Sequence, residues 1–193
     1  MRLAIVGGGA AGFFLAINAK EMMPELEVVI FERQNKVLSK VRISGGGRCN
    51  CTNSFADVTD LRQVYPRGAT LLKRLFKQFG PQDAYQWFES HGVPLTIQPD
   101  QCVFPQAQDS RVIIDCFLRE AARHGILLRL GEKIESPESL FPEFDYVAVT
   151  IGGTPKGEGC VPSLFTFNIN DTLLTALTGT VVENSIASIP GTK

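Results

Sequence analysis

The hydrophobic pattern of residues 1–32 changes period twice and predicts a strand, a helix and a second strand. Arg2–Val6 is a short apolar run that ends at glycines, which is typical of a buried parallel strand. Residues 13–22 follow with a helical pattern, and residues 27–31 form a second β-rich run. Two strands joined by a helix form a βαβ unit, which predicts an α/β fold with a doubly wound parallel sheet.

The rest of the chain alternates between helical and β-rich segments. Helices are predicted at residues 69–79, at Pro81–Ser90, and from a cap at Asp109 or Ser110 as far as Arg123. Residues 34–53 show little regular period and predict a loop. Strands are predicted at residues 93–97, 102–104, 126–130, 133–135, 145–151, 164–169 and 180–189. We therefore expect a Rossmann-like FAD- or NAD(P)-binding domain over residues 1–159, followed by the start of a β-rich inserted domain over residues 160–193.

Glycines directly after the first predicted strand form the pattern G-x-G-x-x-G. Gly7 suits the tight turn, Gly9 leaves room for a pyrophosphate near the backbone, and Gly12 allows close packing of the helix. Ala10 and Ala11 lie between these glycines, just before the predicted helix, whose unpaired N-terminal N–H groups attract phosphate. The turn therefore predicts a dinucleotide site.

An acidic residue closes the second predicted strand, 20 residues beyond Gly12. Glu32 can accept hydrogen bonds from a ribose diol, and its charge would repel a 2′-phosphate. A secretory signal peptide or a membrane span is the alternative for this N-terminus, but four glycines within residues 7–12 interrupt the apolar run. The order strand, glycines, helix, strand and acid favours nucleotide binding.

Composition limits the partners of this chain. The 193 residues include 44% hydrophobic and 20% charged residues, and the net charge is −1. This balance provides no general field for nucleic acid or an anionic membrane, so we expect a small-molecule substrate. Basic residues do gather near Lys36, Lys40, Arg42 and Arg48, which suits a phosphate ligand.

The five cysteines are Cys49, Cys51, Cys102, Cys116 and Cys160. Their odd number and the lack of C-x-x-C spacing argue against a disulfide framework or a zinc site. A reduced, cytoplasmic setting is the simplest interpretation. Inert thiols are favoured over a redox-active one.

Two further glycine groups are candidates for contact with a cofactor. Three consecutive glycines lie between Ser44 and Arg48, where left-handed backbone can direct several N–H groups into one concavity. Arg48 adds a permanent cation and Asn50 adds a donor and an acceptor. We favour a second cofactor loop here over a flexible linker. Gly152 and Gly153 end a predicted strand, where an approach to the same ligand and a purely structural turn remain equal alternatives.

Residues 41–53 resemble the I-S-G-G-G-R-C-N-x-T-N segment of the aminoacetone-oxidase-like FAD-binding enzymes, also described as NAD(P)/FAD-dependent oxidoreductases. Residues 4–12, 103–105 and 162–164 match that family in chain order. The resemblance implies that this chain is an N-terminal and internally shortened piece of such an enzyme, without the segment that completes the flavin pocket.

The resemblance also implies FAD as the cofactor, with NADH, NADPH or an amine-like substrate as hydride donor. By the same resemblance, residues 44–50 would wrap the flavin, and Lys133 and Ile134 would lie near the adenine. The resemblance assigns no catalytic acid or base. The candidate cofactor contacts are Gly7, Gly9, Ala10, Ala11, Gly12, Glu32, Arg33, Lys40, Ser44, Gly45, Gly46, Gly47, Arg48, Asn50, Lys133, Ile134, Gly152 and Gly153. Two other functions remain as alternatives to an FAD-dependent oxidoreductase. One is a dinucleotide-binding module or fragment without catalysis, and the other is one half of an NAD-binding dehydrogenase without flavin.

Overall fold

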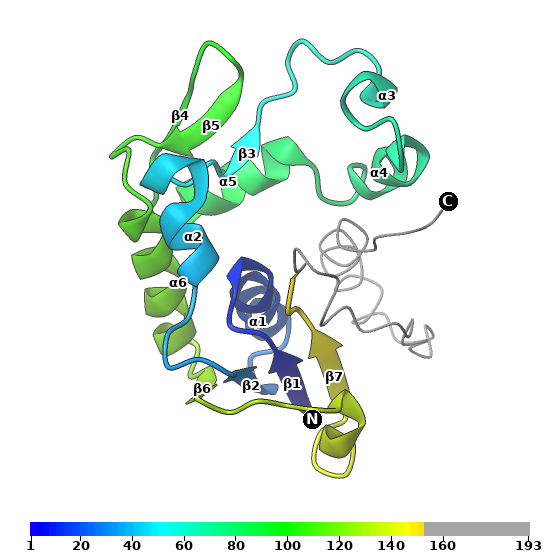
Figure 1. Ribbon diagram of the computed structural model, residues 1–193, viewed down its shortest axis with the longest axis vertical. Helices are drawn as coiled ribbons and strands as arrows, with labels where there is room; N and C mark the ends of the chain where they lie inside the picture. The colour runs from blue at the N-terminus through cyan, green and yellow to red at the C-terminus, as the bar shows by residue number, and fades with distance from the viewer. Residues whose placement is uncertain (153–193) are drawn as a thin grey trace. The chain divides into compact units, whose positions relative to one another are not determined.

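The computed structural model describes residues 1–152 (Figure 1). These residues fall into two compact units, one made of Met1–Ser39 with residues 117–152, and the other of Lys40–Cys116. The strands predicted at residues 164–169 and 180–189, and the predicted domain boundary after residue 159, lie outside the described residues.

The first unit contains the predicted parallel sheet, in the order β6-β2-β1-β7. All three neighbouring pairs are parallel, which confirms the doubly wound α/β prediction. Helix α1 connects β1 to β2 and begins at Ala10 rather than at Phe13, because the chain enters the helix directly from the glycine turn. The bounds are β1 Arg2–Val6, α1 Ala10–Met22, β2 Glu27–Glu32, β6 Leu127–Leu130 and β7 Tyr146–Val149.

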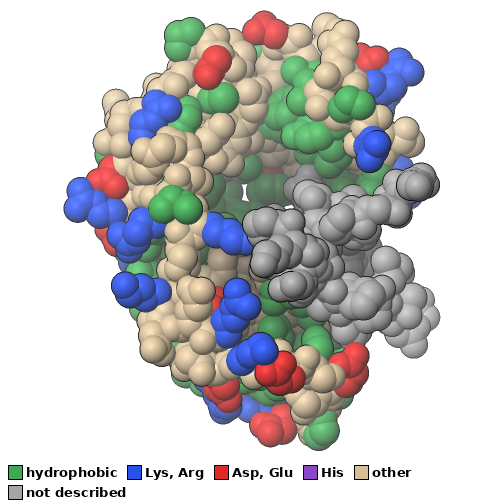
Figure 2. Space-filling view, viewed as in Figure 1, with side chains coloured by type: hydrophobic (Ala, Val, Ile, Leu, Met, Phe, Trp, Pro, Cys, Tyr) green, Lys and Arg blue, Asp and Glu red, His purple; other side chains and the backbone are tan. Residues whose placement is uncertain are grey.

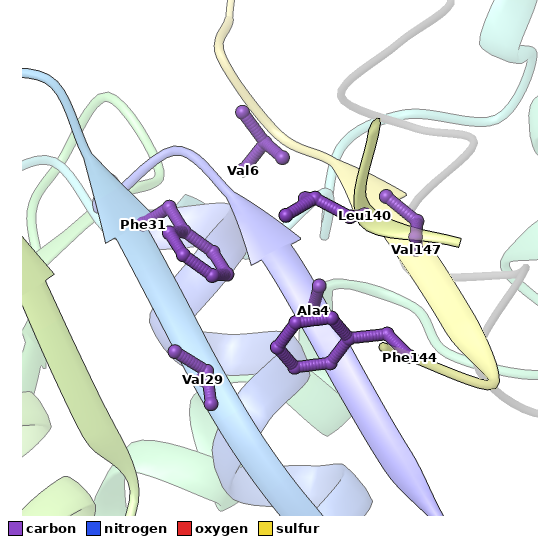
Figure 3. Packing of buried hydrophobic residues seen from close by; sticks show 7 residues of the cluster. All are labelled: Ala4, Val6, Val29, Phe31, Leu140, Phe144 and Val147. Atoms are coloured by element: carbon purple, nitrogen blue, oxygen red, sulfur yellow. The ribbon is translucent and has the colours of Figure 1, made fainter. Parts of the chain in front are cut away.

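Both faces of this sheet are covered, which explains why its central strands are apolar throughout. On one side, Phe13 of α1 contacts Phe117, with ring centroids 6.0 Å apart. On the other side, the rings of Phe144 and Phe31 pack edge to face, with their centroids 5.8 Å apart. Phe144 follows the short helix η2 (Pro137–Leu140) in the chain. Figure 3 shows this second group, which consists of Ala4, Val6, Val29, Phe31, Leu140, Phe144 and Val147.

Helix α6 (Arg111–Arg123) runs from the second unit into the first. The structure confirms the predicted helix. Just before the helix, the Asp109 side chain accepts a hydrogen bond from the Arg111 N–H at 2.9 Å. Val112, which was predicted on the buried face, is half-buried, whereas Ile114 is buried.

The second unit contains the small sheet expected from two β-rich runs. Strands β4 and β5 pair antiparallel, and β3 adds to β5 to give the order β3-β5-β4. Helix α5 has the predicted bounds, while four short elements of residues 39–64 were not predicted, because segments of two to five residues show no measurable period. The bounds are α2 Ser39–Ile43, η1 Ser44–Gly47, β3 Thr52–Asn53, α3 Leu61–Val64, α4 Ala69–Leu75, α5 Pro81–Ser90, β4 Leu95–Ile97 and β5 Cys102–Pro105.

The strand predicted at residues 133–135 is wrong. Strand β6 ends at Leu130, and Gly131 turns the chain with a φ of 70°. The Gly131 N–H then donates to the Gln34 carbonyl at 3.1 Å, and the Glu132 N–H donates to the Glu32 carbonyl at 3.0 Å. These two bonds hold the segment beside the end of β2 as a loop.

Candidate dinucleotide site at the ends of the parallel strands

The middle of the parallel sheet is a topological switch point. Strand β1 lies between β2 and β7. From β1 the chain continues to β2 and β6 on one side of it, and then crosses to β7 on the other side. In open parallel sheets, ligands bind outside the carboxyl ends of the strands at such a point. Here these ends carry Gly7 after β1, Glu32 at the end of β2 and Thr150 after β7.

Gly7 forms the turn that leaves β1. Its φ of 119° lies where side chains are strained, and a Cβ there would be 2.6 Å from the Thr150 carbonyl oxygen. Its N–H donates to the Phe31 carbonyl at 2.8 Å, so the turn remains attached to β2. Only glycine satisfies both the backbone angle and this close approach.

Gly12 packs the first turn of α1 against the glycine turn itself. A Cβ at this position would be 2.1 Å from the Gly7 carbonyl oxygen and 2.9 Å from Thr150 Oγ1. Any larger residue would therefore push the helix away from the end of β1. The start of α1 and the end of the sheet are held as one rigid corner.

Gly9 differs, because a Cβ there would meet no atom of residues 1–152 within 4 Å. Gly9 is the N-cap of α1, with φ −91° and ψ −173°, and it has no side chain to cap the helix. The first turn contains no acidic residue, Ala10 is exposed, and Ala11 is half-buried. The N–H groups of this turn therefore face open space and offer an anion site to a group such as a pyrophosphate.

Glu32 lies directly under the glycine turn. Its Oε2 accepts a hydrogen bond from the Gly8 N–H at 2.9 Å, and its Oε1 accepts one from the Gln34 N–H at 2.9 Å. The carboxylate is half-buried. A carboxylate has about four acceptor positions, so two bonds leave it able to accept from a ribose diol as well.

Gly8 was missed by sequence reasoning because it occupies a free position of the G-x-G-x-x-G pattern. A Cβ there would lie 2.8 Å from Val37 Cγ1 and 3.1 Å from Glu32 Cβ. Its carbonyl accepts a hydrogen bond from the Leu38 N–H at 2.8 Å. The available signal was the glycine itself, since the motif fixes glycine only at positions 7, 9 and 12 and does not require one at position 8.

Thr150 was also missed. Its buried hydroxyl donates toward the Gly7 carbonyl at 3.0 Å and lies 3.3 Å from the Val6 carbonyl. Its N–H donates to the Val6 carbonyl at 2.8 Å. A polar residue at the end of an apolar strand, two positions before Gly152, was the available signal.

The remaining candidates of the first unit occupy its edge. Arg33 is exposed beside Glu32, and Gly152 is exposed with a φ of 70°. Lys133 is exposed and pairs with Glu135 at 2.8 Å, whereas Ile134 packs its side chain against the apolar cluster of Figure 3. Gly153 lies outside the described residues.

The second unit contains the other candidate loop, η1, which is left-handed over three consecutive residues. The φ angles of Gly45, Gly46 and Gly47 are 55°, 69° and 86°. Gly45 and Gly46 are exposed, and a Cβ at Gly46 would meet nothing within 4 Å. At Gly46, therefore, backbone conformation rather than space requires glycine.

Arg48 is bound within its own unit. Its Nε donates to the Gly45 carbonyl at 3.2 Å, its Nη1 donates to Gln108 Oε1 at 3.2 Å, and its guanidinium lies 4.1 Å from the centroid of the Phe104 ring. These contacts give Arg48 a structural function in shaping the loop. Its contact with a cofactor stays a prediction.

Other residues anchor the same loop. The Ser110 N–H donates to the Gly47 carbonyl at 2.8 Å, and Ser44 Oγ donates to the Val41 carbonyl at 3.0 Å. The Asn50 side-chain nitrogen, in the orientation its surroundings require, donates to the Thr52 carbonyl at 2.8 Å. Lys40 is exposed at the start of α2. The loop is thus an ordered structure and not a plain linker.

Residues 1–150 match the family model described as HI0933-like protein Rossmann domain. A curated relative, the 3-dehydro-bile acid delta(4,6)-reductase of Clostridium scindens, is 27% identical over 135 residues, which are 70% of this chain and 32% of the relative. The chain therefore spans about a third of the length of that relative.

Solved structures with a similar fold include THI4 of Thermovibrio ammonificans, with a TM-score of 0.48, 11% identity, and coverage of 81% of this chain and 59% of that chain. Another is the open conformation of a flavocytochrome c3 fumarate reductase, with a TM-score of 0.42, 20% identity, and coverage of 67% and 26%. Within residues 1–152, no helix has the length and apolar character needed to cross a membrane. Over the same residues, no group of three or more His, Cys, Asp or Glu side chains is arranged to hold a metal ion.

Proposed function

Because the chain belongs to the HI0933-like protein Rossmann domain family, we propose that it binds FAD and acts as part of an FAD-dependent oxidoreductase. We place it in the aminoacetone-oxidase-like subgroup on the resemblance of residues 41–53. The geometry of one corner supports this proposal most strongly. There, the N-terminus of α1 has no side-chain cap, a Cβ at Gly9 would meet no atom of residues 1–152 within 4 Å, and Glu32 lies under the same turn.

The first unit fits the adenosine and pyrophosphate parts of FAD. The N–H groups at the start of α1 would hold the pyrophosphate, and the absence of a side chain at Gly9 leaves room for it. Glu32 would accept hydrogen bonds from the adenosine ribose, while its two existing bonds to backbone N–H groups keep the carboxylate oriented. The same charge would disfavour a ribose that carries a 2′-phosphate.

On the resemblance of residues 41–53, loop η1 of the second unit, taken by itself, is our proposed contact with the flavin part. Loop η1 exposes glycine backbone at Gly45 and Gly46, and Arg48 and Ser110 hold its shape. Rigid, exposed N–H groups suit the hydrogen-bonding edge of a flavin ring. When bound, FAD would supply two-electron hydride chemistry, and the residues described here would bind and orient it.

The proposed hydride donor is NADH, NADPH or an amine-like small molecule. The curated relative is named as a reductase, which supports an oxidoreductase without identifying the donor for this chain. On the face shown in Figure 2, Lys and Arg side chains lie next to Asp and Glu side chains at several places, and the net charge is −1. This balance supports a small-molecule substrate over nucleic acid or an anionic membrane surface. We keep the proposal of a reduced, cytoplasmic setting, supported by free thiols at all four described cysteines.

The test is an FAD titration of the chain, followed by its visible absorption spectrum. We expect binding by the wild type, and a loss of about 1–3 kcal/mol in Glu32→Ala, the range for lost hydrogen bonds to a charged group. Glu27→Ala is the matched control, because Glu27 begins the same strand and carries the same charge, with only an exposed pair to Arg2. Equal affinity of the two variants would remove Glu32 from the site.

A second measurement separates an enzyme from a binding module without catalysis. The FAD-loaded chain is mixed with NADH or NADPH, and bleaching of the flavin absorption is followed. Bleaching supports an oxidoreductase. Bound flavin that neither nucleotide nor an amine reduces would favour the binding module, and a chain that binds NAD tightly and FAD not at all would favour a dehydrogenase half.

A further inference from the structure

Two cysteines directly after loop η1 form a C-x-C pair with an unusual backbone. Cys49 has a φ of 63°, which is rare for a residue with a side chain. The Cys51 Sγ lies 3.5 Å from the Cys49 carbonyl oxygen, and the Cys51 N–H donates to the Val103 carbonyl at 2.8 Å. The turn at Cys49 is therefore held in place from strand β5, and both thiols lie within one short bend.

The Cys51 thiol lowers the pKa of the neighbouring Cys49 thiol to about 7, with a smaller contribution from Ser44 and against the opposing effect of burial. The pKa of the Cys51 thiol is raised, because it donates to Cys49, is buried and faces the charge of Cys49. One sulfur is thus prepared as a thiolate, and the other is held protonated beside it.

We propose that Cys49 and Cys51 form a redox-active dithiol that a hydroperoxide oxidises to an intrachain disulfide next to loop η1. The geometric basis is the left-handed bend at Cys49, which brings the Cys51 Sγ within 3.5 Å of the Cys49 carbonyl oxygen. The oxidant is small for a physical reason. Cys49 is only 7% exposed, which admits hydrogen peroxide more readily than a bulky disulfide such as oxidised glutathione.

The reaction balances in two steps. The Cys49 thiolate attacks one oxygen of hydrogen peroxide, the O–O bond breaks, and Cys49 becomes a sulfenic acid while hydroxide leaves. The Cys51 sulfur then attacks the Cys49 sulfur, the S–O bond breaks, and the thiol proton of Cys51 leaves with the hydroxyl group as water. Two thiols are oxidised by two electrons, and one peroxide is reduced.

The other described cysteines lack this arrangement. Cys116 is buried in helix α6, and its Sγ lies 3.8 Å from the His91 carbonyl oxygen. Cys102 pairs across the sheet with Asn53, whose side-chain nitrogen lies 4.0 Å from its sulfur.

The experiment treats the full 193-residue chain with hydrogen peroxide, alkylates the remaining thiols, and identifies peptides by mass spectrometry without reduction. We expect two of the five thiols to be lost, together with a peptide that contains residues 49–51, lacks two hydrogens and carries no alkyl groups there. A disulfide that joins Cys51 to Cys102, or either to Cys160, would overturn the proposal. So would full alkylation of both sulfurs after treatment.

Variants separate the two sulfurs even if one of them disturbs the fold. Cys51→Ala should stop oxidation at a sulfenic acid on Cys49 that dimedone traps, whereas Cys102→Ser should leave the disulfide unchanged. The pH dependence provides a further check. In the wild type, the rate of peroxide consumption should rise as pH increases through about 7, where Cys49 ionises, and the midpoint should move upward in Cys51→Ala, which lacks the donor. An unchanged pH midpoint in Cys51→Ala would contradict the assigned effect of Cys51 on the pKa of Cys49. Faster disulfide formation with oxidised glutathione than with hydrogen peroxide would contradict the inference that the oxidant is small.

Discussion

The two glycine-rich turns of this protein use the same residue for different physical reasons. In the turn after β1, the glycines at positions 7, 8 and 12 are closely surrounded, and a Cβ would come within 2.1–2.8 Å of neighbouring atoms. In loop η1, all three glycines are left-handed. A Cβ at Gly46 would meet no atom of residues 1–152 within 4 Å, whereas one at Gly45 would lie 2.7 Å from the Asn50 backbone nitrogen. The first turn therefore needs glycine mainly for packing, and the second needs it for conformation at all three positions and for packing only at Gly45.

The difference shows how each turn is kept in shape. The first is tightly packed against the ends of β2 and β7 at Gly7, Gly8 and Gly12, whereas a Cβ at Gly9 would meet no atom of the described residues within 4 Å. The second is maintained by its own backbone angles and by a few side chains, above all Arg48. Substitutions that add one methyl group should therefore affect the two turns in different ways.

Gly12→Ala should have the largest effect. Alanine normally stabilises a helix relative to glycine by about 1 kcal/mol, but here its Cβ would lie 2.1 Å from the Gly7 carbonyl oxygen. We expect a loss of about 3 kcal/mol in the free energy of unfolding, at the upper end of overpacking. Urea unfolding followed by circular dichroism measures this free energy. A variant more stable than the wild type would show that the first turn of α1 can move away from Gly7 without cost.

Gly9→Ser should weaken binding without weakening the fold. Serine is a favourable N-cap, so the free energy of unfolding should change by only about a few tenths of a kcal/mol. Its hydroxyl would occupy the helix N–H groups, and FAD affinity should fall by about 1.5–3 kcal/mol, the range for hydrogen bonds to a charged group. Wild-type affinity in this variant would mean that the pyrophosphate does not use the start of α1.

Gly46→Ala should cost about 1–2 kcal/mol of unfolding free energy, because alanine must adopt a left-handed conformation. Gly68→Ala is the matched control, since Gly68 has a φ of 84° and equally open space in the same unit. Both variants should lose similar stability, measured by thermal unfolding. Only Gly46→Ala should also lower FAD affinity, and an equal loss of affinity in both would remove loop η1 from the site.

Thr150→Val should have the smallest effect, about 1 kcal/mol, the net value of a typical hydrogen bond. The valine keeps the volume of threonine but removes the hydroxyl that donates to the Gly7 carbonyl. Thr150→Ser keeps the donor and should preserve the turn. Urea unfolding of both variants makes the comparison, and a more stable valine variant would show that the hydroxyl does not stabilise the turn.

Much of the first unit was predictable because its signals are local. The apolar run of β1, the helical period of α1 and the β-rich run of β2 each arise from neighbouring residues, and the sheet has the parallel order expected of such units. Elements such as β3 were missed because they are too short to show a period. The strand at residues 133–135 was wrongly predicted because apolar and polar residues alternate there within a loop. The glycine turn and the acid beside it were predictable, because the motif fixes the spacing of Gly7 and Glu32, and their contact with a cofactor stays a prediction.

The sequence by itself determined the βαβ unit, the glycine turn at its first corner and the acid at the end of its second strand, because these depend on local period and spacing. Only the tertiary structure decided that Thr150 closes the turn beside Gly7, that Glu32 holds the Gly8 N–H, and that the Arg48 guanidinium lies on the Phe104 ring. These contacts join residues far apart in the chain. They depend on which strands become neighbours and how backbones approach, and no local pattern contains that information.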